Sequence, residues 1–372
     1  MEEPIRVLHI LQRMEAGGTQ ALLMNLYRNI DRKKIQFDFL VVYKEKQFYD
    51  EEINKLGGRI YRLSFREDLN LLKFIKDLKT FFQEHNNYKI VHCHAYTIGY
   101  FCLRAAKKVG INVRIAHSHS NAMTNDIKKY LKKIMQKLFI LHATDLFACS
   151  EEAGKYLFHN KTFNILKNAI ESSKFISNVT VRERIRKELG ISDSFVVGHV
   201  GRFKPEKNHK FLIDIFAEIK KQQLNSKLLI IGNGDPSEEI KKYIYDNGYI
   251  NDVIIMKNRK DVNILYQAMD LFIFPSKYEG LGIVAIEAQT AGIPVLVSTG
   301  VPIETKITPL YDRISLKKSA KLWAEKGLEL SNNNLSHTNM QKYIISSGYD
   351  INATVNKMEK FYLSKINKKV GE

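Results

Sequence analysis

The chain of 372 residues holds 58 lysines and arginines against 40 aspartates and glutamates, a formal net charge of +18. A hydrophobic content of 44% and a charged content of 26% are typical of globular proteins and exclude a disordered or fibrous chain. No apolar run reaches the roughly 20 residues that a membrane-spanning helix needs. The first residues are acidic and the apolar run after them is short, so we expect no secretory signal. Three cysteines without Cys-x-x-Cys spacing favour a reducing cytoplasm and argue against a structural zinc site.

The positive charge fits three kinds of anionic partner: nucleic acid, an anionic membrane face or a phosphorylated ligand. No zinc finger, RNP aromatic box or GxxG clamp accompanies the charge, so we expect no nucleic-acid partner. A lysine-rich composition without functional meaning is an equally open interpretation.

Short apolar runs alternate with amphipathic stretches in the first half of the chain. This pattern predicts strands at 5–11, 37–43, 59–65, 89–95, 113–119 and 145–150, with helices at 17–30, 51–58 and 70–85. The alternation starts again near Phe195, with strands at 196–203, 227–234, 252–257, 271–276 and 294–299. Such alternation favours parallel sheets with helices on both faces.

The domain organisation follows from this repetition. The polar stretch 171–194 is predicted to connect an N-terminal domain, 1–175, to a C-terminal domain, 176–349, and a C-terminal helix at 350–372 to complete the first domain. We therefore expect an α/β protein with two doubly wound, Rossmann-like domains. Domains of this kind bind ligands at the carboxyl ends of their strands, and two that face each other form a cleft.

Two cations follow the first strand of the second domain. In "GRFKPEKN", Arg202 and Lys207 flank a proline-containing loop that leads into a helix near Asn208. Basic side chains beside the N-terminus of a helix can bind an anion, because the free N–H groups and the helix dipole add to their charge. The planar guanidinium of arginine can donate two parallel hydrogen bonds to phosphate oxygens, and lysine supplies a positive charge on a flexible side chain. The alternative is a pair of solvated surface cations.

Two glycines, Gly17 and Gly18, lie between the first predicted strand and the first helix. Glycine lets the backbone approach a ligand closely, here again at a helix N-terminus. The stretch lacks both the GxGxxG pattern and the P-loop lysine, which disfavours NAD and ATP sites of those kinds. A plain tight turn is an equally good interpretation.

The stretch "KYEGLGIVAIEAQTAGIPV", residues 277–295, holds two carboxylates. Glu279 follows a buried strand, and Glu287 lies about two turns into an apolar helix that begins after Gly280-Leu281-Gly282. A carboxylate at such a place can accept paired hydrogen bonds from neighbouring hydroxyls of a ribose or another sugar. A solvated helix face is a poor alternative, because Ile283, Val284 and Ile286 make the helix apolar nearly all round.

Two further features have open interpretations. His117 and His119 share one face of a strand, but no third ligand is evident, so no metal site is predicted. The segment 127–139, "IKKYLKKIMQKLF", places apolar residues on one helical face between five lysines. A basic amphipathic helix suits an anionic membrane surface, and a core-packing helix with a solvated lysine face is equally plausible.

Taken together, "GRFKPEKN" and, about 70 residues later, "FPSKYEGLGIVAIEAQTAGIPVL" resemble the retaining glycosyltransferases of family four, which have the GT-B fold. The pair Glu279-x7-Glu287 matches that family's carboxylate signature. Supporting similarities are the "GGTQ" loop, "HSHSN" and "LLIIGNGD", so the resemblance covers nearly the whole chain. It is similar in particular to bacterial glycosyltransferases of capsule and exopolysaccharide synthesis.

The resemblance implies a role for each matching residue. Arg202 and Lys207 would hold the diphosphate of a nucleotide sugar, and Glu287 the hydroxyls of its ribose. Glu279 and the Gly280-Leu281-Gly282 backbone would hold the donor sugar, and Gly17 and Gly18 would close over the phosphates. A histidine, placed at His119 rather than His117, would face the donor sugar near the acceptor.

The implied reaction is metal-independent, retaining transfer of a hexose or N-acetylhexosamine, with a UDP-sugar as the expected donor and no cofactor. The expected acceptor is a saccharide, lipid-linked, at the inner face of the cell membrane. Other readings are a GDP-mannose-dependent transferase, a glycolipid or teichoic-acid glycosyltransferase, and an enzyme like the UDP-GlcNAc 2-epimerases. A non-enzymatic nucleotide-sugar-binding scaffold is disfavoured by the intact set of cations and acids.

Overall fold

The computed structural model describes residues 3–15, 17–65, 67–119 and 129–367, with the side chains of 97, 129–133 and 367 left out. It divides into unit 1, Met1–Ile170 with Ile351–Glu372, and unit 2, Glu171–Asp350. The limits predicted from the sequence, 1–175, 176–349 and 350–372, lie within a few residues of these. The two units are described separately.

Unit 1 is built on a parallel sheet with the strand order β3-β2-β1-β4-β5-β6-β7. Its strands are β1 (Ile5–Ile10), β2 (Ile35–Val41), β3 (Ile60–Arg62), β4 (Ile90–Cys93), β5 (Val113–Ser118), β6 (Asp145–Ala148) and β7 (Asn164–Ile165). Its helices are α1 (Gly18–Asn29), α2 (Asp50–Lys55), α3 (Leu71–Glu84), α4 (Tyr96–Lys108), α5 (Lys129–Phe139), α6 (Glu151–Phe158) and α14 (Ile351–Asn367).

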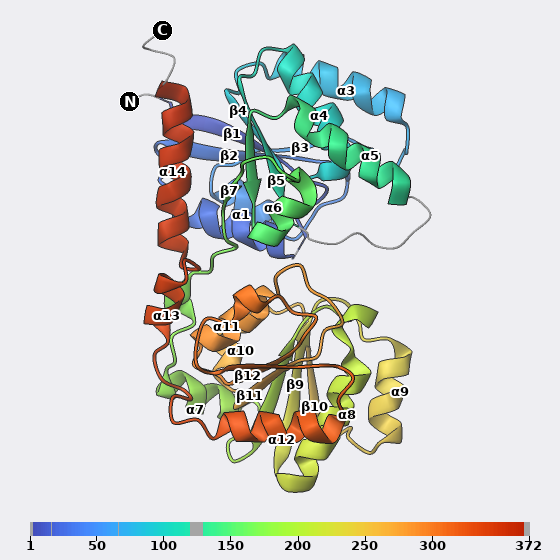
Figure 1. The fold of residues 1–372 in the computed structure, drawn as a ribbon, viewed down its shortest axis with the longest axis vertical. Coiled ribbons are helices and arrows are strands. Elements are labelled where there is room, and N and C mark those ends of the chain that lie inside the picture. The colour runs from blue at the N-terminus through green and yellow to red at the C-terminus, as the bar shows by residue number, and fades with distance from the viewer. Residues whose placement is uncertain (1–2, 16, 66, 120–128, 368–372) are drawn as a thin grey trace. The chain divides into compact units, whose positions relative to one another are not determined.

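Helices cover both faces of this sheet, because alternate side chains of each buried strand point to opposite sides. Residues of α1, α2 and α14 pack with Val7, Ile35 and Ile90 on one face. Residues of α3, α4, α5 and α6 pack with Leu8 and Val91 on the other. The last helix thus returns to the first unit and lies beside α1 (Figure 1).

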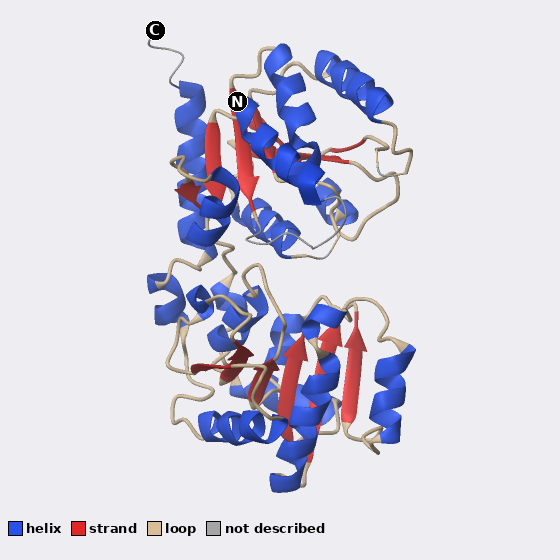
Figure 2. Ribbon diagram, turned by 45° about the vertical axis from the view of Figure 1, so that its right-hand side comes forward, coloured by secondary structure: helices blue, strands red, loops and turns tan. Residues whose placement is uncertain are grey.

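Unit 2 has a parallel sheet with the strand order β10-β9-β8-β11-β12-β13, flanked by helices on both faces (Figure 2). Its strands are β8 (Phe195–Val200), β9 (Ser226–Gly232), β10 (Val253–Lys257), β11 (Leu271–Phe274), β12 (Val295–Ser298) and β13 (Tyr311–Ile314). Its helices are α7 (Val179–Glu188), α8 (His209–Gln222), α9 (Glu238–Asp246), α10 (Val262–Tyr266), α11 (Ile283–Thr290), α12 (Ala320–Ser331) and α13 (Gln341–Ser346). This is the doubly wound order, in which the direction of strand addition reverses between β8 and β11.

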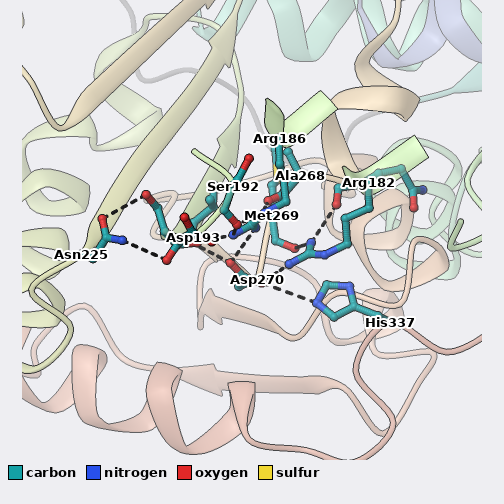
Figure 3. A network of polar contacts seen from close by, with 12 residues as sticks. Arg182, Arg186, Ser192, Asp193, Asn225, Ala268, Met269, Asp270 and His337 are labelled. Carbon is teal, nitrogen blue, oxygen red and sulfur yellow. Dashed lines mark hydrogen bonds and ion pairs between the residues drawn. The ribbon is translucent and has the colours of Figure 1, made fainter. Parts of the chain in front are cut away.

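The segment 171–194, expected to be an inter-domain connection, is instead part of unit 2. It contains α7, and two arginines of α7 bind Asp270 just before β11 (Figure 3). Arg182 also donates to the Gln267 carbonyl at 2.8 Å, and the Asp270 carboxylate accepts from the Val196 amide at 2.8 Å. The arginines that make the segment polar therefore bind carbonyl groups and a carboxylate of unit 2, and the segment is not a linker.

Every strand predicted from the sequence overlaps an observed strand, and the α/β class with two Rossmann-like units is confirmed. The prediction missed the short strands β7 and β13 and the helices α4, α6 and α7. Of these helices, α4 begins without a side-chain cap. Among the described helices, none combines the length and the hydropathy needed to span a lipid bilayer.

Candidate functional site

The predicted cations and carboxylates of unit 2 follow two adjacent strands. Leu271 of β11 pairs with Val197 of β8, so the loops after these strands leave the same edge of the sheet. Arg202 and Lys207 lie after β8, and Glu279 lies after β11. This is the point where the strand order reverses, the usual ligand position of a doubly wound sheet.

The loop after β8 restricts the position of the Lys207 side chain. A short 3-10 turn, Pro205–Lys207, ends at Asn208, whose left-handed backbone (φ 59°) begins α8. The Glu206 carbonyl accepts a 2.8 Å hydrogen bond from the amide of Lys277, which ties the loop to the one after β11. A Cβ on Gly201 would stand 3.3 Å from the Lys207 side chain, so the absence of a side chain at this position gives the lysine its room.

Lys207 and Glu279, which lie 72 positions apart, form an ion pair with Nζ 2.5 Å from Oε1. Their side chains are only 13% and 12% exposed, and the Lys207 ammonium also lies 4.9 Å from the centre of the Phe274 ring. Arg202 is exposed, and within the part of the chain that the structure describes its side chain has no ion pair. The cationic partner of Glu279 therefore comes from a distant part of the sequence.

The backbone between the two acids turns sharply into α11. Gly282 begins this helix in a left-handed conformation, with φ +84°, which side chains adopt only with strain. The Glu279 amide donates to the Gly300 carbonyl at 3.0 Å, and Leu281 is buried. The turn leads from Gly280 directly into the N-terminus of α11, where N–H groups without helical partners favour negative or polar ligand atoms.

Glu287, on α11, is the second carboxylate and is largely buried. Burial raises its pKa to about 7, and a hydrogen bond from the Tyr266 hydroxyl to its Oε2, 3.0 Å long, opposes the rise. When ionised, this carboxylate can accept hydrogen bonds from hydroxyl groups, and when protonated it can donate one. Tyr266 ends α10, and no motif in the sequence pointed to it.

In unit 1, Gly17 and Gly18 follow β1 as predicted. Gly17 is the N-cap of α1 in an extended conformation, and a Cβ there would meet the Gln20 side chain at 2.7 Å. No heavy atom lies within 4 Å of a Cβ built on Gly18. Gly18 is therefore free of packing constraints in the described part of the chain, which leaves space for a ligand to approach its backbone.

Five histidines gather on one face of unit 1, at three neighbouring strands. Alternate positions bring them together: His9 on β1, His92 and His94 at the end of β4, and His117 and His119 at the end of β5. Two chains of hydrogen bonds join their rings. His94 lies between His9, at 3.1 Å, and His119, at 2.8 Å, and His92 lies between His117, at 3.0 Å, and the hydroxyl of Tyr362 on α14, at 2.7 Å.

Burial holds this histidine cluster neutral. It lowers the pKa of His119 to about 3 and takes the pKa values of His92, His94 and His117 well below the usual range, where the neighbouring imidazoles add to the effect. His117 is fully covered, whereas His119 is partly exposed, as a residue that meets a ligand must be. The sequence showed no third residue beside His117 and His119, and the structure places His94 there, with one ring nitrogen of each of the three within 4.8 Å of the others.

The segment 127–139 forms α5 from Lys129 onward, whereas residues 127 and 128 and the side chains of 129–133 lie outside the described residues. Phe139 packs into the core beside α4, and Ile134 is 55% exposed. The part of the predicted apolar face that the structure describes is therefore not fully buried by the unit itself.

The chain matches the profiles of two glycosyltransferase families. Residues 16–164 match "Glycosyltransferase Family 4" and residues 181–349 match "Glycosyl transferases group 1". EpsF of Bacillus subtilis (strain 168), whose name places it among the glycosyltransferases, is 32% identical over 331 residues, 86% of each chain. CapH of Staphylococcus aureus, a capsular polysaccharide biosynthesis glycosyltransferase, is 24% identical over 97% of this chain and 99% of its own.

Solved structures agree on the fold. HepE of Anabaena, crystallised with UDP and glucose, superposes with a TM-score of 0.78 at 16% identity and covers 97% of this chain and 99% of its own. The matched range 181–349 includes the loops of Lys207 and Glu279 and the helix α11 that carries Glu287. The chain belongs to the family 4 glycosyltransferases and has their two-domain GT-B fold.

Proposed function

We propose that the protein transfers a sugar from a UDP-sugar to a lipid-linked saccharide, with retention of the anomeric configuration, in the synthesis of a capsule or exopolysaccharide. The observation that carries the proposal is the meeting of Lys207 and Glu279 at the reversal point of the second sheet. Glu287 follows in the next helix, with a pKa suited to hydroxyl ligands.

Each part of the donor has a partner in this proposal. Arg202 and Lys207 bind the diphosphate, because a free guanidinium and a pre-positioned ammonium complement its charge. Glu287 accepts hydrogen bonds from the ribose. Glu279 and the backbone of Gly280, Leu281 and Gly282 hold the sugar. In unit 1, Gly17 and Gly18 approach the phosphates, and His119 meets the sugar.

The chemistry requires the bond between the anomeric carbon and the diphosphate oxygen to break. Negative charge develops on the leaving oxygen, and Arg202, Lys207 and helix N-terminal amides stabilise it without a catalytic metal. The acceptor hydroxyl attacks from the face that the diphosphate leaves, which retains the configuration. Its proton passes to the leaving phosphate oxygen, so the protein needs no nucleophile, and Glu279 offsets positive charge on the sugar ring.

The names of relatives support the proposed donor and acceptor classes. HepE has been crystallised with UDP-glucose, and an Escherichia coli relative, 23% identical over 79% of each chain, is named a UDP-Gal:α-D-GlcNAc-diphosphoundecaprenol α-1,3-galactosyltransferase. A second candidate is a glycolipid transferase, which the similarity to an α-monoglucosyldiacylglycerol synthase of Acholeplasma laidlawii favours at 27% identity over 68% of the chain. A GDP-mannose-dependent transferase is a third.

A membrane-bound acceptor also requires the protein to reach a lipid surface. We propose that the segment 127–139 binds anionic lipid through its five lysines, Lys128, Lys129, Lys132, Lys133 and Lys137. Binding to vesicles that contain phosphatidylglycerol should weaken as salt rises. Unchanged partitioning after replacement of the five lysines by glutamine would refute the surface role.

Two measurements test the central proposal. Calorimetric titration should show binding of UDP and weaker binding of GDP, and neither should depend on added EDTA. Transfer from a panel of UDP-sugars to undecaprenyl-diphosphate-GlcNAc should then yield a product whose anomeric proton coupling matches that of the donor. Inverted coupling would refute retention, a lipid product made only from diacylglycerol acceptors would favour the second candidate, and failure to bind either nucleotide would refute the transferase function.

A further inference from the structure

We propose that His94, His117 and His119 form a binding site for a transition-metal ion, most suitably Zn²⁺, in unit 1. One nitrogen of each ring lies within 4.8 Å of the corresponding atoms of the other two. Zinc bonds to imidazole nitrogen at about 2.0–2.1 Å and so keeps tetrahedral ligands about 3.4 Å apart, within reach of these rings after small side-chain adjustments.

Buried ring nitrogens without partners point to a missing ligand. Within the described part of the chain, Nε2 of His117 and Nδ1 of His119 are buried and have no hydrogen-bond partner. Buried polar atoms of proteins are nearly always hydrogen-bonded, and an exception calls for a water molecule or an ion. Nε2 of His117 is therefore a proposed donor atom whose bonding the described part of the protein does not complete, and Nδ1 of His119 stays available for a hydrogen bond when Nε2 of the same ring binds the metal.

The remaining contacts determine which nitrogen of each ring is available. His92 occupies Nδ1 of His117, which leaves Nε2 of His117 for the metal. His9 occupies Nε2 of His94, so that Nδ1 of His94 remains, 2.8 Å from Nε2 of His119. A metal between these last two nitrogens would replace the direct hydrogen bond between the rings.

A second set of side chains orients the ligands, as in known metal sites. His9 supports His94, His92 supports His117, and the hydroxyl of Tyr362 supports His92 at 2.7 Å. The rings are buried and neutral, the form that binds metal ions. All candidate donors are imidazoles, which suit Zn²⁺ and later transition metals and do not suit Mg²⁺ or Ca²⁺.

Three protein ligands leave a fourth tetrahedral position for water or an oxygen of a bound molecule. A histidine that binds a metal through one nitrogen retains the other for a hydrogen bond, so ligation of His119 is compatible with contact to a donor sugar. The metal site would join the ends of β4 and β5, and it does not depend on the transfer reaction proposed above. Binding can therefore be tested whether or not the protein transfers sugar.

The test uses the full-length chain without a histidine tag, stripped of metal by dialysis against a chelator. Cobalt(II) is added as a spectroscopic probe, and zinc binding is measured by competition and by elemental analysis after gel filtration. The variants are His117→Gln, which removes a ligand, and His9→Gln, which removes an orienting contact. His159→Asn is the control, because His159 is an exposed histidine of the same unit that lies outside the cluster.

We expect one equivalent of Co²⁺ per chain, with the intense visible absorption of a four-coordinate site, and full displacement by Zn²⁺. His117→Gln should abolish the absorption and the retained zinc, His9→Gln should weaken affinity about 10–100-fold at unchanged stoichiometry, and His159→Asn should match the wild type. The melting temperature of the wild type should rise with added zinc.

A stripped wild-type chain that binds no Co²⁺ or Zn²⁺ would overturn the proposal and assign water to the unpaired nitrogens. Metal binding that survives in His117→Gln but is lost in His9→Gln would also overturn it, in favour of the other trio, His9, His92 and His94. Circular dichroism identifies any variant that fails to fold, and in that case the wild-type cobalt spectrum decides alone.

Discussion

Lys207 Nζ lies 2.5 Å from Glu279 Oε1, and this ion pair joins the two loops that leave the sheet of unit 2 where its strand order reverses. In the proposed complex the two residues have different ligands, the diphosphate and the donor sugar. The pair therefore holds the lysine at the place where phosphate charge would arrive, and it prevents either group from being buried alone.

Replacement of Lys207 by methionine should weaken UDP binding about 10–100-fold, the effect of losing one charge-assisted hydrogen bond of about 1.5–3 kcal/mol. Binding of uridine should change less than about twofold, because uridine has no phosphate to accept this hydrogen bond. Lys204→Met is the matched control, because Lys204 is exposed on the same loop. Calorimetry with both ligands checks this, and an equal loss for uridine and UDP would contradict the phosphate contact.

The same pair makes a prediction about stability. Lys207→Met and Glu279→Gln should each lower the free energy of unfolding, because each leaves a largely buried polar partner. The double variant should lose less than the sum of the two, with a coupling energy of about 1–3 kcal/mol. Urea unfolding of all four proteins measures this coupling. Strict additivity would mean that the ion pair contributes nothing to the folded state.

Uridine binding should strengthen as the pH rises through about 7, the pKa to which burial raises Glu287. The ionised carboxylate accepts two hydrogen bonds from the ribose hydroxyls, whereas the protonated acid donates one itself. Uridine is the suitable ligand because no phosphate group titrates in this range. Tyr266→Phe removes the hydrogen bond that opposes the rise, so it should move the midpoint to higher pH. Tighter binding below pH 6 would contradict the role of Glu287.

The pKa of Glu287 also predicts how stability depends on pH. The pKa of Glu287 in the folded protein, about 7, is above the ordinary value of 4.5. Proton binding by this carboxyl therefore stabilises the folded state fully below pH 4.5, and this stabilisation is lost as the pH rises through 7. Glu287→Gln removes this dependence. The stability of the variant relative to the wild type should therefore increase between pH 4.5 and 7, by at most about 3 kcal/mol. Thermal or urea unfolding at several pH values tests it, and a constant difference would refute the shifted pKa.

Gly18→Ala should lower the affinity for the ligand without lowering the free energy of unfolding. A Cβ at Gly18 meets no atom within 4 Å, and alanine favours the first turn of a helix, so the free energy of unfolding should stay the same or increase slightly. If the backbone of Gly18 approaches the phosphates, UDP-sugar affinity should nevertheless fall, by about tenfold for a contact worth 1–1.5 kcal/mol. The reference is Gly110→Ala, in open space on the same unit but at φ +85°, which should cost stability and leave affinity unchanged.

The alternation of strands and helices and the candidate residues of the donor site could be predicted from the sequence. Buried parallel strands require continuous apolar runs, and residues that follow adjacent strands must meet at one edge of the sheet. For this reason the loops of Lys207 and Glu279 could be placed near each other without coordinates. The roles assigned to these residues, to Gly17 and Gly18 and to His119 remain predictions.

Other relationships depend on register and packing between distant segments, which local patterns do not encode. The polar composition of segment 171–194 led to its prediction as a linker, because the shared partner of Arg182 and Arg186, Asp270, comes more than 80 residues later. Tyr266 reaches Glu287 only because α10 and α11 cover the same face of the sheet. The sequence analysis considered only His117 and His119, because the parallel pairing of β4 with β5, which brings His94 against His119, is not encoded in either segment alone. The sequence by itself determined the architecture and the likeness to a transferase family, because both follow from local hydrophobic periodicity and short motifs. Only the tertiary structure decided which charged and titratable groups meet, because those contacts join residues whose separation along the chain carries no physical information about their distance in space.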